Sequence, residues 1–371
     1  MRVNRLQVEG LRCLRGIDLA VPGRAVWLAG PNGAGKTSVL EAIALLGFGR
    51  SFRGRVAEGL LAEGRESLQV VVHWTDDHGR ERVSGLRHAG DRWEARLDGV
   101  PVERLSDLAA SFPVLAYHPE SVALVTGPAE ERRRVVDWLA FHVEPDFLDH
   151  SRRATRALRQ RNSLLRAQAG DAEFEFWEEE LARAGTAMTL ARRTAVEGLA
   201  EALAPLWTRL AATSAAPPVL HWRAGWREED AALRDLLYLH RGRDRELGYT
   251  TLGPHRADLL LGRPYGGNAG QWSRGQAKLL ALALSLAQAE ALRQRKGALA
   301  LLLLDDLRAE LDEPRFDAVL DWVAACGAQA WITGTGPDPR ALERLAPMPV
   351  FHVEHGRIRD AGTVGDPSQT L

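Results

Sequence analysis

Eight consecutive residues near the start of the sequence have the types and the spacing of a phosphate-binding loop. They fit the pattern G-x-x-x-x-G-K-[ST] and are Gly30, Pro31, Asn32, Gly33, Ala34, Gly35, Lys36 and Thr37. Glycines let successive backbone N–H groups point at phosphate oxygens, and a helix starting near Lys36 adds the positive end of its dipole. Lys36 would reach the β and γ phosphates, and the Thr37 hydroxyl would bind Mg²⁺. The loop therefore predicts a nucleoside triphosphate and magnesium.

The sequence on both sides of this loop supports that interpretation. Residues 25–29 read as a short buried strand, and residues 38–46 have the apolar spacing of a packed helix. A phosphate cradle requires this order of strand, glycine loop and helix. Lysine stands only at positions 36, 278 and 296, and a compact ammonium fits between phosphates where a planar guanidinium does not. The alternative is a chance glycine turn.

A pair of acids supplies the predicted second half of the site. Residues 298–304 are entirely apolar and read as a buried strand that ends in Asp305 and Asp306. In phosphoryl transfer a carboxylate completes the magnesium shell and a neighbouring group orients the attacking water. We assign Asp305 to the metal and Asp306 to the water. The alternative is a solvated turn in which adjacent acids merely cap the strand.

Four residues further along open a second predicted helix about 30 residues before Asp305. They are Ser273, Arg274, Gly275 and Gln276, and Ser273 suits the N-cap. The stretch resembles the signature sequence of ABC-type ATPases. That resemblance implies that this helix start binds the γ phosphate held by the opposite subunit, so that two copies would clamp two ATP molecules. An ordinary capped helix is the alternative.

Two further segments resemble the same ATPases. Residues 309–312 (AELD) resemble the loop that follows the acidic strand, and residues 331–335 (WITGT) end where a switch residue contacts the γ phosphate. Transporter motors usually have a histidine there. Thr333 or Thr335 is the candidate in this chain, and we take Thr333 as the site residue.

The combination of blocks resembles the RecF family of recombination mediator proteins over essentially the whole chain. Besides the loop, the signature and the acidic strand, the matching blocks are GRSFRG at 49–54, YHPESVALVTGPAEERRRVVDW at 117–138, RALRQRN at 156–162 and LGPHRADL at 252–259. Several of these blocks are not shared with transporter motors. Two departures are Ala257, where the family commonly has an acid, and Arg308, where it commonly has a small residue.

The resemblance implies a function as well as a fold. It implies a protein that dimerises on ATP, binds gapped DNA or single-strand to double-strand junctions, and promotes RecA loading with RecO and RecR in recombinational repair and the SOS response. It also implies a weak, DNA-stimulated ATPase in which hydrolysis acts as a timing switch. A motor ATPase that couples to a protein or membrane partner without binding DNA is the competing class.

Charge placement gives separate support for DNA. Between residues 131 and 166, nine arginines face five acids in a chain whose formal charge is −1. Arg152, Arg153, Arg156 and Arg159 share much of one helical face, a spacing suited to successive phosphates. A solvated helix face is an equally good explanation. Arg50 and Arg53 are further candidates for phosphate contacts, although a plain surface loop would also contain them.

The order of these segments predicts the domain organisation. Long helical stretches with few glycines fill the middle of the chain, whereas strands and loops precede and follow them. We expect an α/β fold of the P-loop NTPase class, an ABC/SMC-type ATPase head built from residues 1–112 and 244–371. Residues 113–243 would form an inserted helical lobe.

Composition limits the remaining classes. The chain has 371 residues, 45% of them hydrophobic, with 48 basic and 49 acidic side chains. Two cysteines are too few for a disulfide framework and suit a reducing compartment. An apolar run of about 20 residues, which a membrane span needs, is missing, so we expect a soluble, cytoplasmic protein. His352 and His355 read as hairpin residues rather than as ligands.

Overall fold

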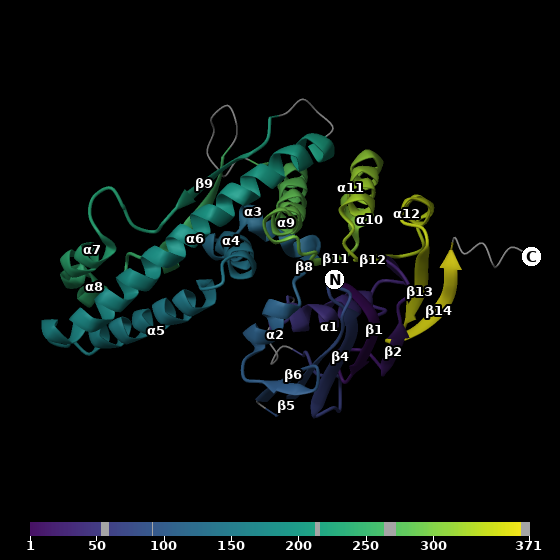
Figure 1. Ribbon diagram of the computed structural model, residues 1–371, viewed down its shortest axis with the longest axis horizontal. Helices are drawn as coiled ribbons and strands as arrows, with labels where there is room; N and C mark the ends of the chain where they lie inside the picture. Colours follow the sequence, from purple (N-terminus) through teal and green to yellow (C-terminus); the bar gives the residue numbers. More distant parts are fainter. Residues whose placement is uncertain (53–58, 91, 212–215, 263–271, 365–371) are drawn as a thin grey trace, which may run out of the picture. The chain divides into compact units, whose positions relative to one another are not determined.

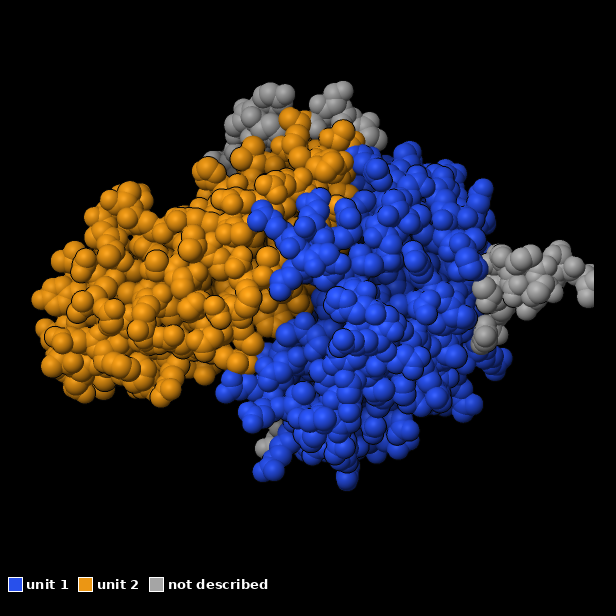
Figure 2. Space-filling model, viewed as in Figure 1, with its two compact units in different colours: residues 1–121, 209–213, 292–371 blue, residues 122–208, 214–291 orange. Residues whose placement is uncertain are grey.

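The computed structural model describes residues 1–52, 59–90, 92–211, 216–262 and 272–364 (Figure 1). The chain forms two compact units (Figure 2). Unit 1 contains residues 1–121, 209–213 and 292–371, and unit 2 contains residues 122–208 and 214–291. Arg53, one of the arginines considered above, lies outside the described residues.

A mostly parallel sheet forms the centre of unit 1. Its strands, in spatial order, are β14 (Arg357–Val364), β13 (Met348–Glu354), β3 (Ala25–Ala29), β12 (Ala330–Gly334), β11 (Leu301–Leu304) and β8 (Val114–Tyr117). Only β14 runs antiparallel, pairing with β13 at one edge. Strands β3, β11 and β12 are buried at every position, which explains their largely apolar sequences.

A second, antiparallel sheet completes the core of unit 1. Its order is β2 (Ile17–Ala20), β1 (Arg2–Glu9), β4 (Ser67–Thr75), β5 (Glu81–Ala89), β6 (Arg92–Leu97) and β7 (Val100–Val102). In β4 every second residue is buried, because one face of this sheet covers the core and the other faces solvent. Helix α1 (Lys36–Phe48) contacts strands of both sheets (Figure 1).

Helix α1 owes its burial to a sequence that is apolar on nearly all sides. Only Thr37 and Phe48 of its thirteen residues escape full burial, as expected for a helix enclosed between two sheets. Unit 1 also contains the helices α2 (Leu105–Ser111), α10 (Leu307–Glu310), α11 (Glu313–Cys326) and α12 (Pro339–Arg344).

Unit 2 is mainly helical. Its elements are α3 (Ala123–Thr126), α4 (Ala129–Val143), α5 (Phe147–Arg166), most of α6 (Asp171–Ala211), the antiparallel pair β9 (Val219–Arg223) and β10 (Asp258–Gly262), α7 (Leu233–Leu239), α8 (Arg241–Leu247) and the first part of α9 (Arg274–Lys296). Arg161 of α5 is fully buried and donates to Glu178 at 3.0 Å and Asp244 at 2.7 Å. This ionic cluster joins α5, α6 and α8.

The unit boundaries differ from those expected from the sequence. Residues 244–291 belong to unit 2, whereas the sequence interpretation placed them with the ATPase domain. Two long-range contacts explain the difference: β10 pairs with β9, and Asp258 accepts two hydrogen bonds from Arg132 of α4. At the other boundary, β8 belongs to the parallel sheet, so unit 1 continues to residue 121.

Within the described ranges, every helix is too short or too polar to cross a bilayer.

Candidate nucleotide site

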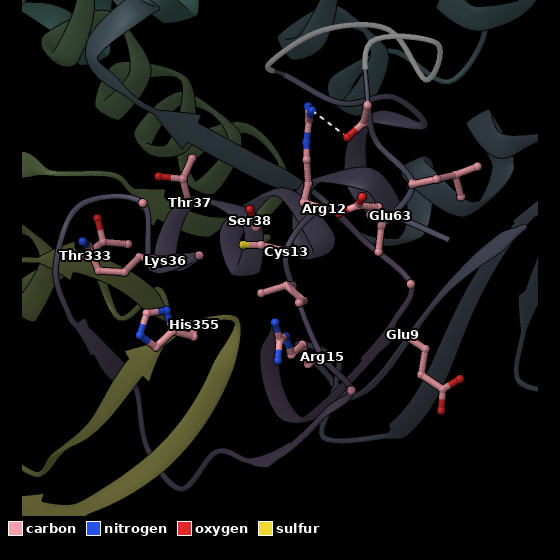
Figure 3. A pocket seen from close by; sticks show the side chains of 18 of the residues that line it. Glu9, Arg12, Cys13, Arg15, Lys36, Thr37, Ser38, Glu63, Thr333 and His355 are labelled. Atoms are coloured by element: carbon pink, nitrogen blue, oxygen red, sulfur yellow. Dashed lines mark hydrogen bonds between the residues drawn. The ribbon is translucent and has the colours of Figure 1, made fainter. Parts of the chain in front are cut away.

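A cavity in unit 1 lies around the loop that connects β3 to α1 (Figure 3). Most residues of the segments 9–16, 32–38 and 59–65 line it, together with Pro119, Asp305, Asp306, Thr333 and His355. Two predicted pairs of site residues, Lys36 with Thr37 and Asp305 with Asp306, therefore meet in this cavity, although the two pairs lie far apart in the sequence.

Two glycines of the loop are required by its geometry. A Cβ atom on Gly30, whose φ is 156°, would stand 2.2 Å from the carbonyl oxygen of Val353 in β13. Gly35 precedes α1 with a φ of 112°, and a Cβ there would approach the Cys13 sulfur at 3.0 Å. Larger residues would push the loop away from its neighbours, so these glycines hold its backbone close to the cavity.

The Lys36 ammonium lies over the loop. Nζ donates to the carbonyl oxygens of Gly30 at 2.7 Å and Pro31 at 2.9 Å. Burial lowers the pKa of Lys36, and the carboxylates of Asp306 and Asp305 oppose that shift. An ammonium has three donors, so one remains for a phosphate oxygen while two hold the loop.

Asp305 is the centre of a short hydrogen-bond network. The Thr37 hydroxyl donates to it at 2.8 Å, and the fully buried Thr333 hydroxyl donates at 2.7 Å. Thr333 Oγ1 also accepts the backbone N–H of Asp306 at 2.8 Å. Thr333 is thus the threonine that lies at the carboxylate, whereas Thr335 is exposed.

The same oxygens suit magnesium. A hydroxyl and a carboxylate converge at Thr37 and Asp305, and Mg²⁺ is usually held by one or two carboxylates while phosphates and waters complete its shell. Among the residues that the structure describes, no cluster of three or more His, Cys, Asp or Glu side chains could hold a metal. The donor set therefore fits a magnesium ion that arrives with a nucleotide.

Asp306 has an unusual backbone and an altered acidity. Its φ is 51°, in the left-handed region, and it caps α10. Burial raises the pKa of its carboxyl, and the charges of Asp305 and Glu310 raise it further, with Lys36 acting in the opposite direction. A carboxylate with a raised pKa is a stronger proton acceptor at neutral pH, which suits the role predicted for Asp306.

The signature residues begin α9 in unit 2. Gln276 N–H donates to Ser273 Oγ at 3.3 Å, and Ser273 N–H donates to Gln276 Oε1 at 3.1 Å. This reciprocal pair is a capping box. Ser273, Arg274, Gly275 and Gln276 are all exposed. Apart from its chain neighbours and the backbone of its own helix, no atom of the residues described by the structure would lie within 4 Å of a Cβ on Gly275.

The predicted DNA-contacting arginines on α5 differ in what they contact. Arg153 forms ion pairs with Glu180 and, at 3.7 Å, with Asp149. Arg156 lies over the Trp177 ring at 5.7 Å. Arg152, Arg156 and Arg159 line a shallow hollow with Ser151, Thr155 and Gln160.

Other arginines counted in the same stretch have internal roles. Arg161 is fully buried, Arg132 is paired with Asp258 at 2.8 Å, and Arg133 donates to the Ala257 carbonyl oxygen at 2.7 Å. The positive surface is therefore smaller than the sequence count implied, and it is concentrated on α5.

The sequence interpretation did not identify several residues that line the cavity. Among the described residues, five non-glycine residues have a positive φ, and three of them lie at this cavity: the predicted Asp306, and Arg12 and His355, which were not predicted there. Arg12 donates to both carboxylate oxygens of the buried Glu41. It also donates to the Gly59 carbonyl oxygen at 3.0 Å (Figure 3). Non-glycine residues in this conformation often mark functional sites.

Comparison with known proteins identifies the family. A family model described as the RecF/RecN/SMC N terminal domain matches residues 2–337. A DNA replication and repair protein RecF from Xanthomonas axonopodis pv. citri (strain 306) is 43% identical over 98% of this chain and 100% of its own length. The chain belongs to the RecF family. A RecF from Thioalkalivibrio sulfidiphilus (strain HL-EbGR7) is 39% identical over 99% of this chain and 100% of its own length.

Solved structures confirm the predicted fold of this RecF-family chain. The structure of the recombination mediator protein RecF with ATP, in the RecFOR pathway, matches with a TM-score of 0.86 at 23% identity and covers 97% of this chain and 98% of that one. The Smc head domain from Pyrococcus furiosus matches with a TM-score of 0.58 at 14% identity over 97% of this chain and 96% of that one. The fold is that of an ABC/SMC-type ATPase head.

The altered acidity of Asp306 predicts a pH-dependent effect on stability. Because its pKa is higher in the folded protein, ionisation of Asp306 opposes folding as the pH rises above the ordinary aspartate value. Asp306→Asn should therefore raise the free energy of unfolding at pH 7, and this gain should shrink as the pH falls towards 4. Urea unfolding at several pH values measures it. A gain that is the same at every pH would contradict the altered acidity.

Proposed function

We propose that this chain is an ATP-dependent DNA-binding protein of recombinational repair, with two nucleotide sites formed across a homodimer. The main support for the proposal is that the two parts of an ABC-type site, the phosphate-binding cavity and the signature helix start, belong to different units of the chain. Unit 1 builds the cavity from its own residues, while unit 2 presents an exposed, capped helix start that contains Gly275.

Gly275 is the most informative residue of that helix start. Glycine costs roughly 1 kcal/mol relative to alanine within a helix, and neither a positive φ nor a close neighbour among the described residues requires it here. We infer that its function lies outside the folded monomer, where a side chain would block the approach of a second molecule. The helix start would then place backbone N–H groups and its dipole at the γ phosphate held by a partner.

The residues of the cavity would carry out hydrolysis in steps that their positions support. Lys36 and the loop N–H groups would bind the β and γ phosphates, and Thr37 with Asp305 would hold Mg²⁺, which neutralises charge on the phosphates. Asp306 would orient a water and accept its proton as the oxygen attacks the γ phosphorus. The bond from the γ phosphorus to the bridging oxygen breaks, and ADP leaves.

We further propose that hydrolysis is weak, is stimulated by DNA and acts as a timing switch in the cytoplasm. The relatives are named DNA replication and repair proteins, and a solved neighbour is described as a recombination mediator in the RecFOR pathway. On that basis we propose gapped or junction DNA as the ligand. RecR and RecO would be the partners, and RecA loading during repair and the SOS response the outcome.

The role of Gly275 leads to a first test. Gly275→Ala should raise the free energy of unfolding by up to about 1 kcal/mol and yet weaken the ATP-dependent dimer roughly tenfold or more, because an added methyl overpacks the contact. Sedimentation velocity with and without ATP and Mg²⁺ measures the dimer. Gly242→Ala is the matched control, since Gly242 is also a helical glycine whose added Cβ would have no described neighbour within 4 Å. If Gly275→Ala dimerises as well as the control, the proposed contact is wrong.

The arginine surface of α5 leads to a second test. Replacing Arg156 and Arg159 by alanine should weaken binding to a gapped duplex and reduce the slope of log K against log salt by about 0.9 for each lost phosphate contact. Fluorescence anisotropy across a range of salt concentrations measures both quantities. Arg193→Ala, which removes an arginine that pairs with Glu228, should leave the slope unchanged. An unaltered slope in the double variant would exclude this surface.

A further inference from the structure

His355 lies at the tip of the hairpin formed by β13 and β14. Glu354 pairs with Arg357, so the loop consists of His355 and Gly356 alone. Their φ angles are 47° and 72°, and two successive positive values are characteristic of a type I′ turn. The imidazole is exposed and lines the nucleotide cavity together with Lys36, Cys13 and Arg15 (Figure 3).

Contacts with the phosphate loop and with residues 13–15 fix the position of this tip. Gly356 N–H donates to the Ala34 carbonyl oxygen of the phosphate loop at 2.9 Å, and the Gly356 carbonyl oxygen accepts the N–H of Arg15 at 2.8 Å. A Cβ on Gly356 would stand 1.8 Å from the Cys13 carbonyl oxygen. The hairpin is therefore held between the loop and residues 13–15, and His355 is held at the edge of the cavity.

Histidine tolerates a left-handed backbone but is not among the residues preferred in this turn. Asn, Asp and Gly are strongly preferred at the first position of a type I′ turn. The same chain has such a residue in the turn between β6 and β7, where Asp98 and Gly99 have φ angles of 52° and 80°. There the Asp98 carboxylate accepts the Val83 N–H at 2.9 Å, which stabilises the turn locally. His355 instead lines the cavity with its ring, where the imidazole can reach a ligand (Figure 3).

The strand order indicates which part of a nucleotide His355 would meet. Strand β3 lies between β12 and β13, and β11 follows on the side of β12. Thr333 and Asp305, which mark the γ-phosphate and magnesium end, belong to β12 and to the end of β11. His355 follows β13 and so lies on the opposite side of the phosphate loop, beside Cys13 and Arg15.

We propose that His355 is a nucleotide-contacting residue whose imidazole donates a hydrogen bond to the ribose and α-phosphate end of the bound nucleotide. The inference rests on the proposed function, since it assigns a contact within the same ATP site. It gives the C-terminal hairpin a role in binding the nucleoside end, in addition to supporting the phosphate loop.

His355→Asn and His355→Gly test the proposal without disturbing the turn, because both replacements favour a left-handed backbone. Isothermal titration of the full chain with ATP and with ADP, in Mg²⁺, should show both nucleotides bound about tenfold more weakly than by the wild type, as expected for the loss of one charge-assisted hydrogen bond. The factor should be the same for ATP and ADP, because the γ phosphate is not contacted. Thermal unfolding should stay at or above the wild-type midpoint.

Asp98→Asn is the matched control, since it changes the same turn position at a site that does not line the cavity. It should bind both nucleotides like the wild type. Wild-type affinity in both His355 variants would overturn the proposal, and a larger loss for ATP than for ADP would overturn the placement at the nucleoside end. A wild-type chain that binds neither nucleotide would instead contradict the proposed function itself.

Discussion

The nucleotide site depends on one carboxylate that holds together three neighbouring strands of the parallel sheet. Asp305 follows β11, Thr333 lies in β12, and Thr37 follows the loop that leaves β3, and both hydroxyls donate to the Asp305 carboxylate. Parallel strands that lie side by side end at the same edge of the sheet, so residues about 270 positions apart become neighbours. The buried strands fix this edge, and the hydroxyl–carboxylate network fixes on it the oxygens that we propose bind magnesium.

Backbone strain is concentrated around the same cavity. Arg12, Asp306 and His355 all have left-handed backbones there, and each is held by contacts from a different part of unit 1. Arg12 is fixed by Glu41, Asp306 by Thr333, and the His355 turn by Ala34 and Arg15. Such conformations persist only where the surrounding structure determines them. The fold therefore holds three charged or polar side chains around a nucleotide before it binds.

Local sequence patterns predicted the parts of the site whose geometry is local. The glycine loop, the apolar strand before Asp305 and the Ser273 cap each depend on residues close together in sequence, and each is present in the structure. His355 could not be predicted as a cavity residue, because its position depends on contacts with Ala34 and Arg15 far along the chain. The arginine count was misleading for the same reason, since Arg132 and Arg161 have their partners 126 and 83 residues away.

The central claim is that each nucleotide is held by two copies of the chain, and a mixing experiment tests it most directly. Lys36→Met removes the lysine contact to the phosphates, and Ser273→Arg blocks the approach of the helix start to the partner's nucleotide. Neither variant alone should therefore hydrolyse ATP. A heterodimer restores one intact site of two, and an equimolar mixture should regain between about a quarter and a half of the wild-type rate per chain. The contrary result has two parts: Ser273→Arg alone hydrolyses ATP at the wild-type rate, and the mixture is no more active than its two folded components. That result would show that one chain completes the site.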